Sequence, residues 1–186
     1  GAGEIIGIAA VTRPLVTGEV RKQNLVVFAS DGIWVCEVSD TGTYSSMRNI
    51  SREVCADPDS ICQLDQSIFF ATNRSLSRFV ESDVVSISKD LDGPYFDTNK
   101  LNLDVPQGSD LVLLRNFIIS IEKYLEMGRV IYDYVSMRIL ILPSNYKTDE
   151  KFVAMVYSIR DGAWSTMVMP KLKAAINFYP SPYIQF

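Results

Sequence analysis

Short apolar runs separated by turn-forming residues fill most of the chain. The runs are rich in Val, Ile, Phe and Tyr, and clusters of Gly, Pro, Asn, Asp and Ser follow them at intervals of about 8–12 residues, a spacing typical of all-β folds. We therefore predict a mainly β fold of short antiparallel strands. The expected strands are Ile5–Val11, Leu25–Ala29, Ile33–Val38, Tyr44–Ile50, Ser67–Thr72, Leu76–Val80, Val84–Ile87, Val130–Val135, Arg138–Leu142, Val153–Ile159, Trp164–Met169 and Ala174–Tyr179.

One tetrad, Asp-Gly-X-Trp, occurs twice, at Asp31–Trp34 and at Asp161–Trp164. Each copy follows a strand-like run that ends in an aromatic residue, Phe28 in the first and Tyr157 in the second. Because Asp-Gly adopts positive φ at low cost, each tetrad is expected to close a two-residue hairpin, with Trp in the strand that follows. The duplication indicates an architecture that reuses one β unit.

A second sign of repetition is the offset of 42 residues between Phe28-Ala29-Ser30 and Phe70-Ala71-Thr72. A four-stranded propeller blade is about 40–50 residues long. The spacing therefore predicts β-propeller-like blades. The chain has three recognisable β units, which are few for a closed ring, so a fragment of a longer protein is an open alternative.

The periodicity changes between residues 109 and 128. Ser109 or Asp110 can cap the start of a helix there, and Gly128 can end it. We predict one inserted α-helix, at about 109–127, that docks on the β core. It would separate N-terminal β units (1–108) from a C-terminal β unit (129–186) within one compact domain. The apolar stripe of this helix is Leu111, Leu114, Ile118, Ile121 and Leu125.

Composition narrows the class of protein. The chain has 186 residues, of which 47% are hydrophobic and 22% charged, as in a soluble globular protein. A net charge of −4 argues against a general nucleic-acid-binding surface. Lys171-Leu172-Lys173 and Arg21-Lys22 could form a local basic patch, but ordinary solvated charge is the preferred interpretation. We see no signal peptide and no apolar stretch of about 18 residues, so no membrane association is expected.

The chain contains no histidine, which excludes His-based triads and His-ligated metal sites. Its three cysteines, Cys36, Cys55 and Cys62, form no Cys-X-X-Cys pair. Cys55 and Cys62 flank a turn and could pair only in an oxidising compartment, so reduced thiols are the simpler expectation. We predict no metal and no cofactor.

Acidic side chains are the abundant catalytic candidates. Asp57 with Asp59, or Asp90 with Asp92, could form a carboxylate pair of the glycosidase kind, and Asp57, Asp59 and Asp65 could suggest calcium. These residues lie in loops where Asp is favoured because it bonds its own backbone. We therefore predict no catalytic residue and no enzyme.

Trp34 and Trp164 are candidates for stacking on a ligand such as a sugar ring. A Trp beside a hairpin turn and among alternating apolar residues is more often a core residue. Core packing is the preferred interpretation for both.

Further strand-and-turn segments, spread over most of the chain, are Pro14–Glu19, Leu25–Trp34, Thr43–Ser45, Ile50–Cys55, Phe70–Arg74, Tyr132–Ile139 and Val156–Trp164. Together they resemble proteins of phages and prophages of Bacteroides-type gut bacteria, similar to the β-propeller-bearing nozzle and stabilisation components of short-tailed phage tails. Where that family often has Arg-Gly in the second hairpin, this chain has Arg74-Ser75. The resemblance implies a structural role and no catalytic residue.

The expected function is that of a non-enzymatic phage or prophage virion protein of the tail or neck, an assembly scaffold whose partners are other virion proteins or copies of itself. Its expected location is the virion if a phage encodes it, and otherwise the cytoplasm. The alternative is a propeller-type module of a gut bacterium that binds a glycan or a protein. A hydrolase with paired carboxylates is a third hypothesis, which only composition supports.

Overall fold

The computed structural model describes residues 3–11, 24–38, 43–64, 66–72, 75–89, 101–102, 129–177 and 182–186. Within these ranges the protein is all-β: strands β1 to β15 are accompanied by two short 3₁₀ segments, η1 (Pro58–Ser60) and η4 (Ser144–Lys147), and by no α-helix. The helix predicted at 109–127 and Arg74 of the Arg74-Ser75 pair lie outside the described residues.

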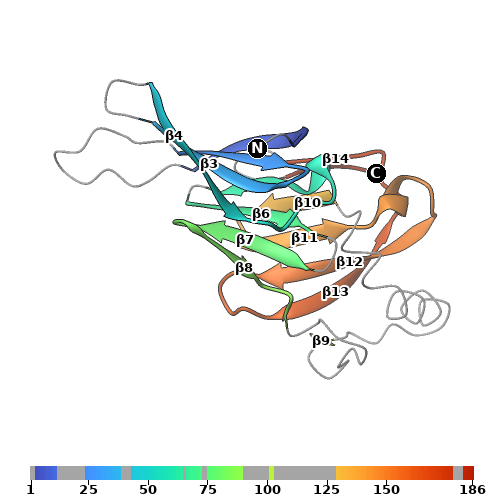
Figure 1. Ribbon diagram of the computed structural model, residues 1–186. Coiled ribbons are helices and arrows are strands. Elements are labelled where there is room, and N and C mark those ends of the chain that lie inside the picture. The colour runs from blue at the N-terminus through green and yellow to red at the C-terminus, as the bar shows by residue number, and fades with distance from the viewer. Residues whose placement is uncertain are drawn as a thin grey trace.

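The strands form three four-stranded antiparallel sheets and one two-stranded sheet (Figure 1). In the third of these sheets a short fifth strand, β9, adds in parallel to β13. The first sheet contains β1 (Ile5–Val11), β2 (Asn24–Ala29), β3 (Gly32–Val38) and β4 (Tyr44–Ser51). The second contains β5 (Cys62–Leu64), β6 (Ser67–Ala71), β7 (Leu76–Val80) and β8 (Asp83–Ser86). The third contains β10 (Arg129–Asp133), β11 (Arg138–Leu142), β12 (Lys151–Ser158), β13 (Trp164–Pro170) and β9 (Leu101–Asn102). The fourth contains β14 (Ala174–Ile176) and β15 (Tyr183–Gln185).

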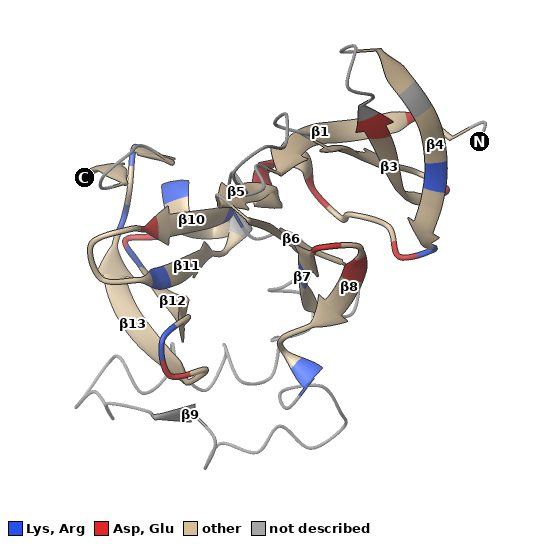
Figure 2. Cartoon of the chain, turned by 90° about the vertical axis from the view of Figure 1, so that its left-hand side faces the viewer, with Lys and Arg blue, Asp and Glu red and all other residues tan. Residues whose placement is uncertain are grey.

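The sheets pack face to face in chain order, as a fan (Figure 2). Phe28 and Ile33 of the first sheet meet Phe70 of the second in one core cluster. A second cluster lies between the second and third sheets, and a third lies between the third sheet and β14–β15. The first strands of the sheets follow one another, with β1 beside β5 and β5 beside β10. This order confirms a mainly β fold of blade-like sheets.

Coverage on both faces explains why the middle strands are continuous apolar runs. All five residues of β6 are buried. In β11, Ile139 and Ile141 face the second sheet, whereas Leu140 and Leu142 face the fourth. Period-two alternation of polar and apolar residues is lost when both faces of a strand are covered.

The predicted strands are confirmed, with differences at the edges. The strands β5, β9 and β15 were not expected, because each has only two or three residues and too few positions to show a period. The strand predicted at Ala174–Tyr179 ends at Ile176. Between β11 and β12 lies the core residue Tyr146, and β12 begins at Lys151, two residues before the strand predicted from Val153.

The two tetrads form turns of different kinds. In the first, Ser30 and Asp31 make the two-residue loop, and Gly32, paired with Ala29, begins β3. The expectation that Asp-Gly itself forms the loop was therefore wrong by one residue. In the second, residues 159–163 separate β12 from β13, and Gly162 has a φ of +65°. The Gly162 amide donates to the Ser158 carbonyl, which closes a wider turn.

The 42-residue offset places both of its segments in the second strand of a sheet. Phe28 and Phe70, however, point toward each other, with ring centroids 4.9 Å apart in an edge-to-face contact. Phe28 faces the sheet that follows it, and Phe70 faces the sheet that precedes it. The residue of β6 that faces the following sheet is Phe69. The four-stranded unit does repeat, but the alignment of Phe28 with Phe70 is wrong by one residue, because Phe69 is the residue of β6 that points the same way as Phe28.

Candidate interaction surfaces

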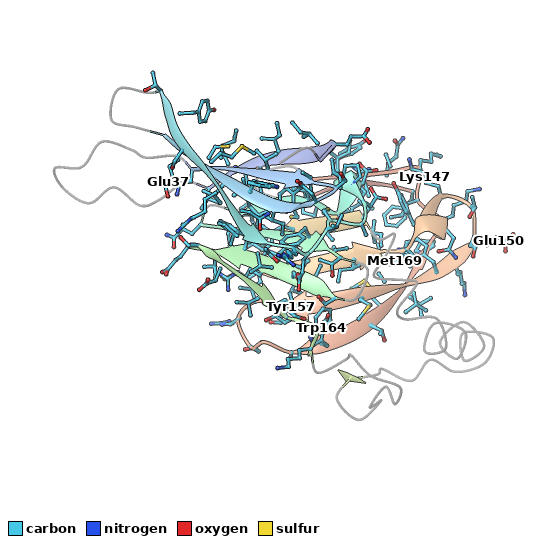
Figure 3. The ribbon with its side chains drawn as sticks, in the orientation of Figure 1. Glu37, Lys147, Glu150, Tyr157, Trp164 and Met169 are labelled. Atoms are coloured by element: carbon cyan, nitrogen blue, oxygen red, sulfur yellow. The ribbon has the colours of Figure 1, made fainter. Side chains whose placement is uncertain are left out.

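Trp164 is a core residue. It begins β13, is 6% exposed and belongs to the cluster between the second and third sheets. Its ring lies 4.8 Å from that of Tyr157, its partner in the strand register (Figure 3). This is the geometry that the packing interpretation expects.

Trp34, in contrast, lies on the face of its sheet that points away from the neighbouring sheet. It is half-buried in β3 and points away from the second sheet, opposite Val27 in the register. Its indole Nε1 donates to Asp31 Oδ1 over 3.0 Å. The structure therefore does not bring the two candidate Trp residues together, and stacking of a ligand on Trp34 stays a prediction.

The outer face of the first sheet is largely apolar, although the polar residue Asn49 on β4 pairs with Trp34 at its edge. Opposed pairs along its strands place Ile8, Val27 and Trp34 in one row, and Leu25, Cys36 and Met47 in the next. Ile8 and Met47 are 54% and 55% exposed, whereas Val27, between Ile8 and Trp34, is only 6% exposed. We call this surface, made of these six residues, the leading face of the stack.

The outer face of the fourth sheet is apolar as well. Ala175 and Ile184 point into the third sheet, so their neighbours Ile176 and Tyr183 point outward. Ile176 is 50% exposed and Tyr183 is 54% exposed. We call this pair of residues the trailing face. Neither face was predicted, because the sequence does not show which sheets lie at the ends of the stack.

The candidate carboxylates have structural partners. Asp57 Oδ1 accepts from the Asp59 amide over 2.8 Å and caps η1. Asp59 Oδ2 lies 3.4 Å from Arg129 Nη1, which connects η1 to β10. Asp65, Asp90 and Asp92 lie outside the described residues. Among the residues that the structure describes, no group of three or more Cys, Asp or Glu side chains could hold a metal ion.

The three cysteines are free thiols. Burial raises the pKa of the Cys62 thiol to about 12, although a hydrogen bond with Asn177 acts in the opposite direction. Burial also raises the pKa of the Cys55 thiol, although a hydrogen bond with Ser60 and one that the thiol donates to the Asp57 carbonyl act in the opposite direction. Both thiols are held neutral, which removes the thiolate that nucleophilic chemistry needs.

Amide side chains join neighbouring sheets at the inner strands. The Asn177 side chain, just after β14, accepts from the Tyr132 amide over 2.8 Å and donates to the Val130 carbonyl over 3.2 Å. Gln63 of β5 similarly accepts from the Ala10 amide of β1 over 3.3 Å. In each case the free edge of a first strand is bonded by a residue of the next unit.

Of the two basic candidates, the structure describes only Lys171 and Lys173. Lys171 and Lys173 are exposed on either side of Leu172, which is fully buried against the third sheet. Arg21 and Lys22 lie outside the described residues. Figure 2 shows both signs of charge distributed over the described part of the three larger sheets. No helix in the described ranges is long and apolar enough to cross a membrane.

Fold and surfaces together define a class: a mainly β protein of face-stacked four-stranded sheets, with largely apolar faces at both ends of the described stack. Comparison with models of known protein families and with curated proteins finds no match to the chain.

Proposed function

We propose that this protein is a non-enzymatic structural component of a phage or prophage virion, in the tail or neck, where it acts as an assembly scaffold. The observation that carries the proposal is the stack itself. Three four-stranded sheets and the two-stranded β14–β15 sheet pack in series, with exposed apolar residues on the face at each end. A unit of this kind is a rigid body with surfaces for neighbours and does not depend on a reactive group.

Two further features support a structural role. The candidate carboxylates Asp57 and Asp59 stabilise a turn and an ion pair, and the buried thiols are neutral. The net charge of −4 would repel DNA from the wall of a conduit, as a tail component requires. The strand-and-turn resemblance to propeller-bearing tail components agrees with both. Within the proposal, the fan of sheets is part of a β-propeller.

Labelling of particles tests the proposal directly. An antibody against the chain should decorate purified virions in electron micrographs, at the tail or neck, and mass spectrometry of the same particles should detect its peptides. Particles that contain no such peptide would exclude the virion role. An unrelated cytoplasmic protein of the host serves as the control for contamination.

One observation favours the second candidate, a module that binds glycans. The indole of Trp34 is half-buried on an outward face, and Asp31 fixes its orientation. Aromatic rings held in this way can stack on sugar rings. Glycan-array binding that is lost in Trp34→Ala and kept in Trp164→Phe would support this function over the scaffold.

A further inference from the structure

We propose that the leading face of the stack is a docking surface for the trailing face of a second copy of this chain. The contact is head-to-tail, with the outer face of β1–β4 seated on the outer face of β14–β15. This inference rests on the proposed scaffold function and specifies its partner and its surface.

The first argument is the repeated manner in which the sheets meet. Each sheet presents one face to the sheet before it and the opposite face to the sheet after it, at three successive interfaces. The first sheet lacks a described sheet before it, and the fourth lacks one after it. The two end faces are therefore complementary in kind, and stacking another copy continues an arrangement already made three times within the chain.

The second argument comes from the two Trp residues. Trp164 lies on the face that the third sheet turns toward the sheet before it, where the second sheet buries the ring to 6% exposure. Trp34 lies on the corresponding face of the first sheet and is only half-buried. An adjoining sheet thus covers this face of the third sheet at Trp164, on its fourth strand, whereas the same face of the first sheet is only partly covered at Trp34, on its third strand.

The third argument is the position of the exposed residues. The Asn177 side chain, just after β14, bonds to β10, the first strand of the preceding sheet. β14 therefore lies next to β10, just as β10 lies next to β5. In a docked second copy, the first strand that would lie next to β14 is β1, which carries Ile8. Ile176 on β14 and Ile8 on β1 therefore meet in the stacked pair, each about half exposed in the single chain, at 50% and 54%. A contact between two different surfaces of one protein either closes a ring or grows into a filament.

The test uses the wild-type chain and one lysine variant at each face. Sedimentation or light scattering should show wild-type mass rising above the monomer mass of 20.9 kDa with concentration. Ile8→Lys and Ile176→Lys should each weaken self-association by about tenfold or more, because a charge would be buried in an apolar contact. Val135→Lys is the matched control: Val135 is 73% exposed in the turn after β10, away from both end faces, so self-association should be unchanged.

Mixing the two variants gives the decisive result. Ile8→Lys keeps an intact trailing face and Ile176→Lys keeps an intact leading face, so an equimolar mixture should form a one-to-one dimer that neither variant forms alone. A face that binds itself would instead let one of the variants dimerise unaided, which overturns the head-to-tail contact. Circular dichroism that matches the wild type shows that the variants are folded.

The remaining outcomes separate this inference from the proposed function. Wild-type protein that stays monomeric at all concentrations overturns the stacking, even if antibodies label virions. It would overturn the stacking equally if another segment of a longer natural chain filled the leading face. Self-association by the mixed pair with unlabelled virions supports the stacking and refutes the virion role.

Discussion

Gly32 and Gly162 occupy the same place in the two tetrads, yet their replacement by alanine should have different costs. Gly32 has a φ of +133°, and a Cβ there would lie 2.3 Å from the Ser51 carbonyl oxygen and 2.9 Å from Asn49 Nδ2. Ordinary C···O contacts are about 3.3 Å or longer, so β4 would have to move by about 1 Å. At Gly162 the φ is +65°, and the nearest atom, the Tyr157 hydroxyl oxygen, is 4.0 Å away.

The magnitudes follow from these distances. Gly162→Ala incurs only the left-handed backbone conformation, about 1–2 kcal/mol, partly offset because alanine restricts the unfolded chain. Gly32→Ala adds a clash with backbone to a similar conformational cost, and overpacking of this kind adds about 1–3 kcal/mol. We expect Gly32→Ala to lower the free energy of unfolding by about 2 kcal/mol more than Gly162→Ala does.

Urea unfolding followed by tryptophan fluorescence measures the difference, provided that both variants keep the wild-type dependence on denaturant. Equal losses in the two variants, or a larger loss in Gly162→Ala, would refute the reasoning. The close approach of β4 to Gly32 would then not be the reason for glycine at that position.

Three further predictions concern the contacts between sheets. Trp164→Ala should lower the free energy of unfolding by about 3–5 kcal/mol and Trp34→Ala by less than half as much, since only Trp164 is fully within the core; equal losses in thermal unfolding would contradict this. Asn177→Ala should cost about 2–4 kcal/mol and speed hydrogen exchange of the Tyr132 amide, because the Tyr132 amide and the Val130 carbonyl lose their partner; unchanged exchange would argue against this role. The raised pKa of Cys62 predicts that the free energy of unfolding is constant below pH about 9 and falls as pH rises toward about 12, since the thiol of the unfolded chain loses its proton first. Cys62→Ala should flatten this pH dependence. An identical dependence in the variant would exclude Cys62 as its source.

The strands could be predicted from sequence because most are long enough to show their pattern. β2 and β3 contain the continuous apolar runs Leu25–Ala29 and Ile33–Cys36, and apolar β-branched residues with turn residues between them delimit β10 to β13. The tetrads correctly marked hairpins. The exact loop was missed at Gly32 because its requirement for glycine comes from Ser51, a residue 19 positions away (51 − 32) on β4.

The end faces could not be predicted, for a physical reason. Phe69 and Ile8 are both apolar strand residues, and nothing local distinguishes the one that is fully buried from the one that is 54% exposed. The difference depends on whether another sheet follows on that side, which is a property of the whole stack. Asn177 was missed for the same reason, since its partners on β10 are about 45 residues earlier in the chain.

The repeated packing of one sheet on the next also gives a reason for the apolar residues on the two end faces. A terminal unit that ended in solvent would be expected to carry polar residues on its outer face, as capping repeats do in solenoid proteins. β1 instead carries Ile8 outward and β14 carries Ile176, in strands that could accept Thr or Lys at those positions without changing the register. Each side chain is about half exposed at 54% and 50%, and burying the rest in a contact would contribute on the order of 1 kcal/mol at each position. Apolar residues on both end faces are therefore the pattern expected of a repeating interior, as the proposed stacking requires.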